Sequence, residues 1–456
     1  MGEVKFDPAC GDGMKLVEAL QLSNQAQVAF TGGGGKTTAL FRLGRELTAP
    51  VFLTTTTHLG LEQVSYADQH MVIQNQSNLE LFLKDIPERV ILLTGPETPD
   101  GRVSGLGPDS LDILHEYCDK NKIPLLIEAD GSRGLPLKAP APHEPNIPAW
   151  VTDSVSVAGM NGILKPLDAR FVHRPERFAA IAGISLGDSV SVESITKVLL
   201  HPDGGLKNIP PHARRIALLN QVDSDELQSQ VGRIARALTE SYHSVLVGSL
   251  KEQGESEISS CYKATAGIIL AAGGASRFGQ PKPLLEWRGQ PFVRRVTLTA
   301  LEAGLKPVVI VTGNASDAVQ NSVEDLPVQT VYNPEWQTGQ SSSIKAGINA
   351  LPPQSGATFF LMADQPQVTS EILSAQLDLY RRTLAPIVAP LIGGKRGNPV
   401  LFDQAAFPAL RSITGDSGGR QVFSQFHVTW LEWNDVSLLL DVDTPEDYQR
   451  LLGFQQ

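Results

Sequence analysis

The chain has 456 residues, 41% of them hydrophobic and 19% charged, the proportions of an ordinary globular protein with room for two large domains or about three. Its formal net charge of −11 argues against non-specific binding to nucleic acid, which needs a basic surface. The three cysteines are far apart, no early apolar run resembles a signal peptide, and no run approaches the ~20 apolar residues of a membrane span. We therefore expect a cytoplasmic protein without a disulfide framework, a zinc site or a membrane segment.

A glycine-rich segment follows the first predicted strand, which covers residues 27–31. The strand leads into Gly32-Gly-Gly-Gly-Lys36-Thr37-Thr38, and a helix is expected over residues 39–47. This order is typical of a P-loop, in which backbone amides surround phosphates, Lys36 reaches the β and γ oxygens and Thr37 binds Mg²⁺. The strict motif fails at Phe30, where it requires glycine. A structural turn is the alternative to the predicted phosphate site, which comprises Gly33, Gly34, Gly35, Lys36, Thr37 and Thr38.

Strands and helices alternate after this loop, which predicts a P-loop-like, doubly wound parallel sheet. Further strands are expected at 51–54, 90–94, 124–130, 154–158 and 216–220. The strand at 124–130 delivers Asp130 to the edge of the sheet, in the manner of a Walker B carboxylate that holds Mg²⁺. The loop 131–145 carries Arg133, Lys138 and His143 close behind Asp130. We interpret it as a site loop, with an ordinary surface loop as the alternative.

The strand at 216–220 ends in Asn220-Gln-Val-Asp223. This run resembles the Asn-Lys-x-Asp base-recognition element of GTPases, with Gln221 in place of the lysine. Asp223 is expected to accept a hydrogen bond from a nucleotide base, although the missing lysine weakens the case for guanine. A nucleotide, ATP or GTP, is therefore predicted at this domain.

Four segments together resemble the YqeC family, known as accessory proteins for selenium-dependent molybdenum hydroxylases: 32–38, 128–145, 159–176 and 220–223. The run Glu128-Ala-Asp-Gly-Ser-Arg-Gly-Leu-Pro-Leu-Lys138 is the most distinctive part of the resemblance. The resemblance implies a role near the molybdenum cofactor, with an apo molybdenum hydroxylase as a partner, but no reaction. The polar residues 251–260 predict a linker between a first domain at 1–255 and a second at 262–456.

The second half opens with a short apolar run that breaks into glycines, Gly267-Ile-Ile-Leu-Ala-Ala-Gly-Gly-Ala-Ser-Arg-Phe-Gly-Gln-Pro-Lys282. A glycine turn after a buried strand exposes amides that cradle phosphates, and Arg277 and Lys282 neutralise the remaining charge. Neither the dinucleotide fingerprint nor Walker A is present, and an ordinary glycine-rich loop is the alternative. The phosphate-binding loop is predicted to include Leu270, Ala271, Ala272, Gly273 and Gly274.

This run resembles the signature of nucleotidyltransferases, in particular molybdenum cofactor cytidylyltransferases of the MocA type, and the likeness covers roughly residues 265–453. It implies a Rossmann-like nucleotidyltransferase sheet of the GT-A type, with CTP and Mg²⁺ bound at the glycine loop. The strand at 358–363 delivers Asp364, which is predicted to bind Mg²⁺, with a simple turn as the alternative. The resemblance makes Asp443 the second metal carboxylate and places the loops 394–402 and 414–420 at the acceptor pocket.

The implied reaction is attack by the terminal phosphate of molybdopterin on the α-phosphorus of CTP, with loss of pyrophosphate. Such transfer needs positioning and charge neutralisation more than a protein nucleophile. Lys282 is assigned to the α-phosphate, Arg277 to the leaving pyrophosphate and Asp364 to the metal. Two alternatives stay open: a sugar- or polyol-phosphate nucleotidyltransferase, and a non-catalytic chaperone that carries finished cofactor to an apo-hydroxylase.

Overall fold

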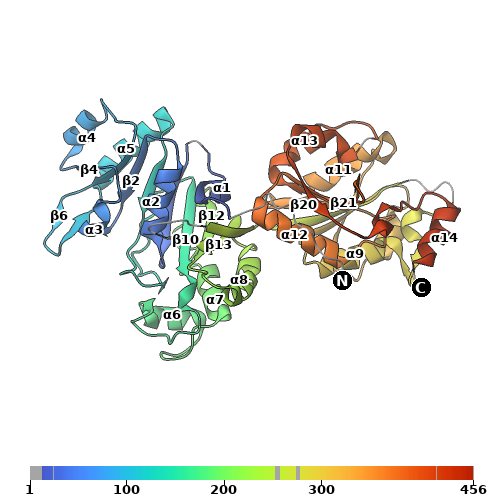
Figure 1. Cartoon of the computed structure of the whole chain (residues 1–456), viewed down its shortest axis with the longest axis horizontal. Helices are drawn as coiled ribbons and strands as arrows, with labels where there is room; N and C mark the ends of the chain where they lie inside the picture. The colour runs from blue at the N-terminus through green and yellow to red at the C-terminus, as the bar shows by residue number, and fades with distance from the viewer. Residues whose placement is uncertain (1–12, 24, 252–256, 274–277, 417, 455–456) are drawn as a thin grey trace. The chain divides into compact units, whose positions relative to one another are not determined.

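A computed structural model of the protein describes residues 13–23, 25–251, 257–273, 278–416 and 418–454 (Figure 1). The chain divides into two compact units, with the boundary between Tyr262 and Lys263. Among the described residues, no helix combines the length and the apolar composition needed to cross a membrane. Each unit has its own sheet and its own core.

The N-terminal unit is built on a nine-stranded sheet with the order β14-β13-β12-β10-β1-β8-β2-β5-β4. The strands are β1 (Gln27–Gly32), β2 (Val51–Thr55), β4 (Gln69–Val72), β5 (Val90–Thr94), β8 (Leu125–Glu128), β10 (Asp153–Gly159), β12 (Arg214–Asn220), β13 (Ser244–Ser249) and β14 (Glu257–Tyr262). Neighbouring strands run parallel, apart from the antiparallel pair β13–β14. The predicted parallel sheet is therefore confirmed. The order reverses between β1 and β10, and such a point is where ligands bind in sheets of this kind.

The helices and small sheets of this unit surround the large sheet. The helices are α1 (Leu16–Leu20), α2 (Lys36–Glu46), α3 (Leu61–Val64), α4 (Gln76–Phe82), α5 (Pro108–Asn121), α6 (Pro175–Ala182), α7 (Val192–Leu200) and α8 (Asp225–Leu238). The short strands are β3 (His58–Gly60), β6 (Glu97–Thr98) and β7 (Arg102–Ser104) in one sheet, and β9 (Leu137–Lys138) and β11 (Val172–His173) in another. In α8, Ser224 caps the first turn, and the helix buries a face spaced as an amphipathic helix requires: Val231, Ile234, Ala235 and Leu238.

The segment expected to be a linker, 251–260, overlaps the edge strand β14. Ile258 and Cys261 of this strand are fully buried, while Glu257 is exposed. The strand was not predicted because most residues of the segment are polar. The unit boundary consequently lies beyond the expected end of the first domain at residue 255. Residues 252–256 lie outside the described part of the chain.

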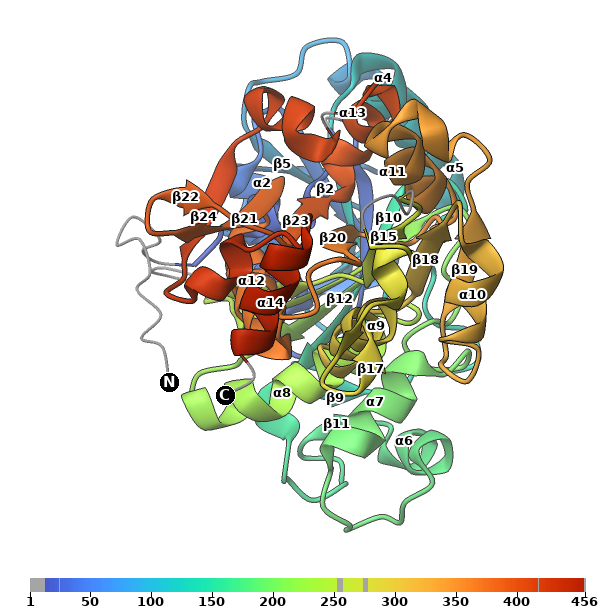
Figure 2. The same ribbon diagram turned by 90° about the vertical axis from the view of Figure 1, so that its right-hand side faces the viewer.

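The C-terminal unit contains an eight-stranded sheet with the order β19-β18-β15-β20-β23-β21-β22, and β24 pairs with β21, as can be followed in Figure 2. The strands are β15 (Thr265–Ala271), β18 (Val308–Thr312), β19 (Gln329–Tyr332), β20 (Ala357–Met362), β21 (Ile387–Ile392), β22 (Lys395–Arg396), β23 (Val400–Asp403) and β24 (Val428–Glu432). The expected α/β sheet is confirmed, but it is mixed, because β23 runs antiparallel to both β20 and β21.

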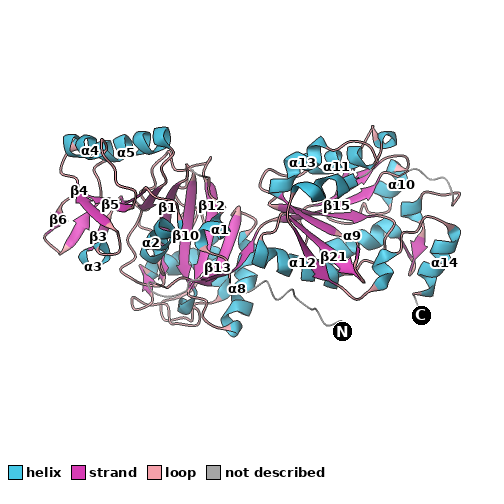
Figure 3. Ribbon diagram, turned by 45° about the horizontal axis from the view of Figure 1, so that its top comes forward, coloured by secondary structure: helices cyan, strands magenta, loops and turns pink. Residues whose placement is uncertain are grey.

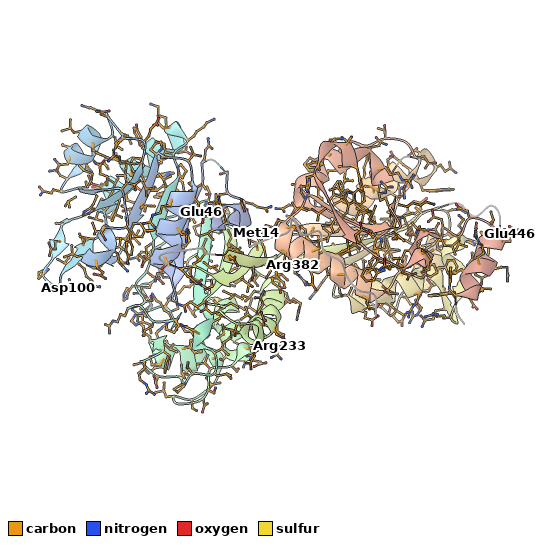
Figure 4. All side chains as sticks on the ribbon, in the orientation of Figure 1. Met14, Glu46, Asp100, Arg233, Arg382 and Glu446 are labelled. Carbon is orange, nitrogen blue, oxygen red and sulfur yellow. The ribbon has the colours of Figure 1, made fainter. Side chains whose placement is uncertain are left out.

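Helices cover both faces of this second sheet, as Figure 3 shows, with α11 and α13 on one side and α9 and α12 on the other. The helices are α9 (Phe292–Glu302), α10 (Ser316–Asn321), α11 (Gln340–Asn349), α12 (Ser370–Thr383), α13 (Phe407–Ser412) and α14 (Pro445–Gly453), and a ribbon of β16 (Glu286–Trp287) and β17 (Gln290–Pro291) precedes α9. Ile344 and Ile348 of α11 pack with Ile268 and Val311 of the sheet in one buried cluster. Side chains fill the space between helices and sheet in both units (Figure 4).

Candidate functional sites in the two units

A glycine loop leaves β1 of the N-terminal unit where the strand order reverses, and it leads directly into α2. Gly32, Gly34 and Gly35 have φ angles of +93°, +76° and +115°, which side chains rarely adopt. A Cβ atom at Gly34 would lie 2.3 Å from the backbone nitrogen of Gly159 in β10. The loop therefore requires glycine both for its backbone conformation and for its close approach to the neighbouring strand.

The amides of this loop fall into two groups. The Gly33 and Gly34 amides donate to the carbonyls of Val157 and Leu135, both at 2.9 Å, so these two predicted phosphate ligands shape the loop. A cavity of about 840 Å³ is lined instead by the residues that follow, Gly35, Lys36, Thr37 and Thr38. The amides at the start of a helix have no partner within the helix and point toward its N-terminal end. An anion is therefore favoured at the start of α2.

Lys36 is almost completely buried at the start of α2. Its Nζ atom donates to the Gly32 carbonyl at 2.9 Å and to the Ser132 hydroxyl at 3.2 Å. The same atom lies 3.6 Å from the Glu128 carboxylate and 3.5 Å from that of Asp130. A buried ammonium is tolerated because two carboxylates and two dipoles surround it.

The carboxylate that faces the cavity from the end of β8 is Glu128. Thr37 Oγ1 donates to Glu128 Oε2 at 2.7 Å, and both residues line the cavity. Asp130, the predicted metal ligand, does not line it. Its oxygens accept the Gly32 amide at 3.1 and 3.2 Å and Lys138 Nζ at 2.7 Å. Asp130 thus holds the glycine loop, while a threonine hydroxyl and a carboxylate, both suited to Mg²⁺, meet at Thr37 and Glu128.

Sequence reasoning missed Glu128, although it stands only two residues before Asp130. Burial is the main influence on Glu128 and raises the pKa of its carboxyl group, while Lys36 and the hydrogen bond from Thr37 oppose the rise. A divalent cation beside Glu128 would favour its charged form for the same reason that Lys36 does.

The predicted base-recognition residues separate in the structure. Asp223 is exposed, accepts a hydrogen bond from the Ser249 hydroxyl at 2.5 Å and does not line the cavity. Gln221 lines the cavity, whereas Asn220 is bonded to the glycine loop: its Nδ2 donates to the Gly34 carbonyl at 2.8 Å. Its Oδ1 accepts the Leu250 amide at 2.8 Å. Asn220, at the end of β12, thereby fixes the glycine loop, whereas Asp223 is hydrogen-bonded to Ser249 instead.

In the C-terminal unit, Lys282 lies between the two predicted metal carboxylates. Its Nζ is 2.5 Å from Asp443 Oδ1 and 3.9 Å from Asp364 Oδ2. Asp364 follows β20 and lines a cavity of about 470 Å³, as do Asp441 and Asp443. Burial raises the pKa of Asp364 to about 6, Lys282 opposes the rise, and Asp441 and Asp443 add to it. Sequence reasoning missed Asp441, which accepts a hydrogen bond from Gln365 at 2.5 Å.

The glycine loop after β15 is described in part. Leu270 lines the same cavity as Asp364, Ala271 and Ala272 are buried, and Gly273 is exposed. The predicted residues Gly274 and Arg277 lie outside the described residues. Where side chains are described, no three His, Cys, Asp or Glu residues are arranged to hold a metal ion by themselves. Mg²⁺ typically takes one or two carboxylates and completes its shell with water and substrate phosphates, so Asp364 and Asp443 fit that ion.

Two family models match this chain: the YqeC protein over residues 28–176 and the MobA-like NTP transferase domain over residues 267–430. The "Uncharacterized protein YqeC" of Escherichia coli (strain K12) is 32% identical over 215 residues, which cover 44% of this chain and 77% of that protein. The first half belongs to the YqeC family, and the second half is a MobA-like nucleotidyltransferase. The predicted fusion and the predicted enzyme class are confirmed.

Relatives of the transferase domain have different names. "Nicotine blue oxidoreductase" of Paenarthrobacter nicotinovorans is 32% identical over 196 residues, covering 41% of this chain and 95% of that protein. "Molybdenum cofactor cytidylyltransferase" of Escherichia coli (strain K12) is 25% identical over 186 residues, covering 40% of this chain and 92% of that protein. The crystal structure of Rv0371c from Mycobacterium tuberculosis H37Rv is 27% identical, with a TM-score of 0.39, and covers 42% of this chain and 98% of that one.

The transferase domain brings two arginines to the cavity that contains Asp364. Arg396 and Arg420 come from the two loops expected at the acceptor pocket, and Asn398 and Asp416 of these loops also line the cavity. The Arg396 guanidinium stacks on the Phe423 ring at 4.6 Å. Burial lowers the pKa of Arg396, and Arg420 lowers it further, so the two cations are close. One cavity is thus lined by both aspartates and arginines.

Proposed function

We propose that the transferase domain transfers a cytidylyl group from CTP to molybdopterin carrying molybdenum. The observation that carries the proposal is that Lys282 lies between Asp364 and Asp443, two carboxylates that line one cavity with Arg396 and Arg420. The named activity of the 25% identical Escherichia coli cytidylyltransferase supports the choice of acceptor. The Leu270-Ala-Ala-Gly273 run supports CTP, because related guanylyltransferases typically read Leu-Ala-Gly-Gly.

The proposed step forms one bond and breaks another at the α-phosphorus. A phosphate oxygen of the acceptor attacks, the bond to the β-phosphate oxygen breaks, and pyrophosphate leaves. Lys282 neutralises charge on the α-phosphate, and Arg396 with Arg420 orients the acceptor phosphate. Asp364 and Asp443 would hold Mg²⁺, which supplies charge neutralisation between nucleotide phosphates when it is bound. Arg277 keeps its proposed role at the leaving pyrophosphate.

The test is pyrophosphate release by the purified protein with Mg²⁺, molybdopterin and each of CTP, GTP, ATP and UTP in turn, with the product identified by its mass. We expect CTP to be preferred. Equal or faster release with GTP would reverse the nucleotide assignment. Release with a sugar phosphate but not with molybdopterin would identify another acceptor, and no release with any pair would favour a carrier of finished cofactor.

For the YqeC domain we infer a nucleoside triphosphate site, for ATP or GTP, at the start of α2. Its phosphates would meet the amides from Gly35 to Thr38 and the Lys36 ammonium, and Mg²⁺ would be held by Thr37 and Glu128. Asp223 remains a proposed base contact only if the bound nucleotide extends beyond the cavity lining. A role in maturing a molybdenum hydroxylase, selenium-dependent in the resembling family, belongs to this proposal.

The nucleotide site is tested by calorimetric titration of ATP and GTP with and without Mg²⁺. Lys36→Ala should weaken binding at least tenfold, since the ammonium neutralises phosphate charge. Glu128→Gln should remove the gain in affinity that Mg²⁺ gives. Lys84→Ala, an exposed lysine of the same unit, is the matched control. Unchanged affinity in the Lys36 variant would contradict the site.

A further inference from the structure

A chain of alternating charges runs from the glycine loop of the YqeC domain into the wall of its cavity. Its members in order are Glu128, Lys36, Asp130, Lys138, Glu144 and Arg174, with successive N–O distances of 3.6, 3.5, 2.7, 2.7 and 2.8 Å. Lys138 is 1% exposed and Arg174 is 26% exposed, so the middle of the chain is buried, whereas both of its ends, Glu128 with Lys36 and Glu144 with Arg174, line the cavity. Its three carboxylates balance its three cations.

Five further basic side chains line the cavity outside this balanced chain, His58, Arg102, Arg133, His143 and His173, and two of them matter here. They are Arg133 and His143, and neither forms an ion pair or a side-chain hydrogen bond among the described residues. Glu62 lines the cavity without an ion pair as well, and Arg102 is already paired with Asp100 at 2.5 Å. A guanidinium left without a carboxylate partner in a ligand cavity is free to bind an anion.

The backbone of the same wall is strained. Arg133 and Arg174 have φ angles of +54° and +63°, in the left-handed region that favours glycine. Gly134, with φ of +71°, follows Arg133 directly, so this turn already contains one glycine in the same left-handed region. Residues held in such conformations cluster at binding sites, where the surrounding fold fixes the direction of a side chain.

Pairing of β9 with β11 ties the two arginine segments together. Lys138 lies opposite His173 in this parallel pair, and Ala139 donates its amide to the His173 carbonyl at 3.2 Å. Arg174 donates to both oxygens of Glu144, at 2.8 and 2.9 Å. In the wall formed by Arg133, His143, His173 and Arg174, strand pairing thus fixes His173 and the ion pair with Glu144 fixes Arg174.

We propose that this wall is a second anion site, which holds the phosphate group of a co-substrate in the cavity that the nucleotide enters. Arg133 would contact the phosphate through its planar fork, with His143 beside it and Arg174 fixed behind it by Glu144. The cavity of about 840 Å³ lies toward the upper end of the sizes of ligand sites. The proposal deepens the inferred nucleotide site, because it makes the YqeC domain a two-substrate site rather than a nucleotide sensor.

The experiment uses the full chain and inorganic phosphate as the probe. Phosphate is titrated by calorimetry into protein saturated with ADP and Mg²⁺, which occupy the start of α2. We expect phosphate to bind, and Arg133→Ala to weaken its binding at least tenfold while the affinity for ADP stays unchanged. Arg102→Ala is the matched control, since Arg102 lines the same cavity but is paired with Asp100, labelled in Figure 4. Its affinity for phosphate should equal that of the wild type.

Arg133→Gly separates binding from folding. Glycine relieves the left-handed strain at this position, so the melting temperature should hold or rise while phosphate binding is lost. Competition of phosphate with ADP for one site would overturn the proposal, as would wild-type phosphate affinity in both Arg133 variants. If ADP does not bind, but phosphate binding depends on Arg133 and not on Lys36, the nucleotide site fails and the second anion site stands.

Discussion

At the scale of single residues, Lys282 holds together two carboxylates that would otherwise repel one another. Asp364 and Asp443 both approach its ammonium group, and Asp441 lies in the same cavity. Burial raises the pKa of Asp364 to about 6, because a buried carboxylate is poorly solvated. A cation next to Asp364, as Lys282 is here, favours the charged form.

Asp364→Asn should reduce pyrophosphate release while leaving the fold intact. Loss of a metal ligand removes about 3 kcal/mol of transition-state stabilisation, which corresponds to a rate roughly 100-fold lower. The matched control is Asp325→Asn, because Asp325 is an exposed aspartate that pairs with Arg294 at 2.6 Å outside the cavity. Initial rates at saturating CTP and Mg²⁺ provide the measurement. A turnover close to that of the wild type would remove Asp364 from the metal site.

His173 should make the YqeC domain sensitive to mild acid. Burial, together with the charges of Arg174, Lys138 and Arg133, lowers the pKa of His173 from its ordinary 6.5 to about 4. Because the unfolded chain binds the proton more readily, the contribution of neutral His173 is complete above pH 6.5 and is lost as the pH falls toward about 4. Thermal unfolding between these pH values should show a smaller decline for His173→Gln than for the wild type. Parallel declines would contradict this assignment.

The residue types of both sites could be predicted from the sequence, but the orientation of their side chains could not. The glycine loops, Lys36, Lys282 and Asp364 follow from local patterns, and Asp443 from the resemblance to the cytidylyltransferases. Strand alternation predicts the direction of side chains only within β8, which ends at Glu128. Asp130 lies beyond this end, so the sequence did not show that Glu128, and not Asp130, faces the cavity. Asp223 was predicted from a motif whose first member, Asn220, bonds the glycine loop instead.

At the scale of elements, the ends of parallel strands position the glycine loop of the YqeC domain. Gly34 is held from two sides. Its amide donates to the Leu135 carbonyl, and its carbonyl accepts a hydrogen bond from Asn220 Nδ2. These contacts join β1, the loop after β8 and the end of β12. The conformation of the glycine loop therefore depends on contacts with strands other than the one that it follows.

Asn220→Ala should destabilise the YqeC domain and weaken nucleotide binding together. The change removes two hydrogen bonds and leaves the Gly34 carbonyl and the Leu250 amide unsatisfied in the interior, at a cost of about 2 kcal/mol. Asn220→Asp is informative, since it keeps the acceptor for Leu250 but turns a carboxylate toward the Gly34 carbonyl. Urea unfolding and ATP titration of both variants measure the two effects. Loss of affinity without loss of stability would mean that Asn220 contacts the ligand itself.

Long apolar strands were predictable, whereas short and polar ones were not. The run at β5 is apolar except for its last residue, and the structure buries all of it. β9 and β11 contain two residues each, too few to show a periodicity, yet they build the wall that carries the proposed second anion site. β14 was read as a linker because Ile258 and Cys261 stand among serines and glutamates. Pairing with distant segments, rather than local composition, creates these elements.

At the scale of the whole molecule, each half has its own glycine loop, its own lysine and its own carboxylates. Lys36 and Glu128 line one cavity, and Asp364 lines another next to Lys282, in a different compact unit. One glycine loop cannot serve two separate sheets. The two halves therefore contain distinct candidate sites.

We expect fragments 1–262 and 263–456 to fold and to bind their ligands separately. A fragment ending at residue 255 should be less stable than one ending at 262 by at least about 2 kcal/mol, because it loses β14 with the buried Ile258. Urea unfolding compares the two fragments, and cytidylyl transfer by fragment 263–456 measures its independence. Lys36→Ala in the full chain should leave that transfer unchanged. If the fragment is inactive alone, or if the Lys36 variant slows transfer in the full chain, then the two sites are coupled, and nucleotide binding in the YqeC domain controls the chemistry of the transferase.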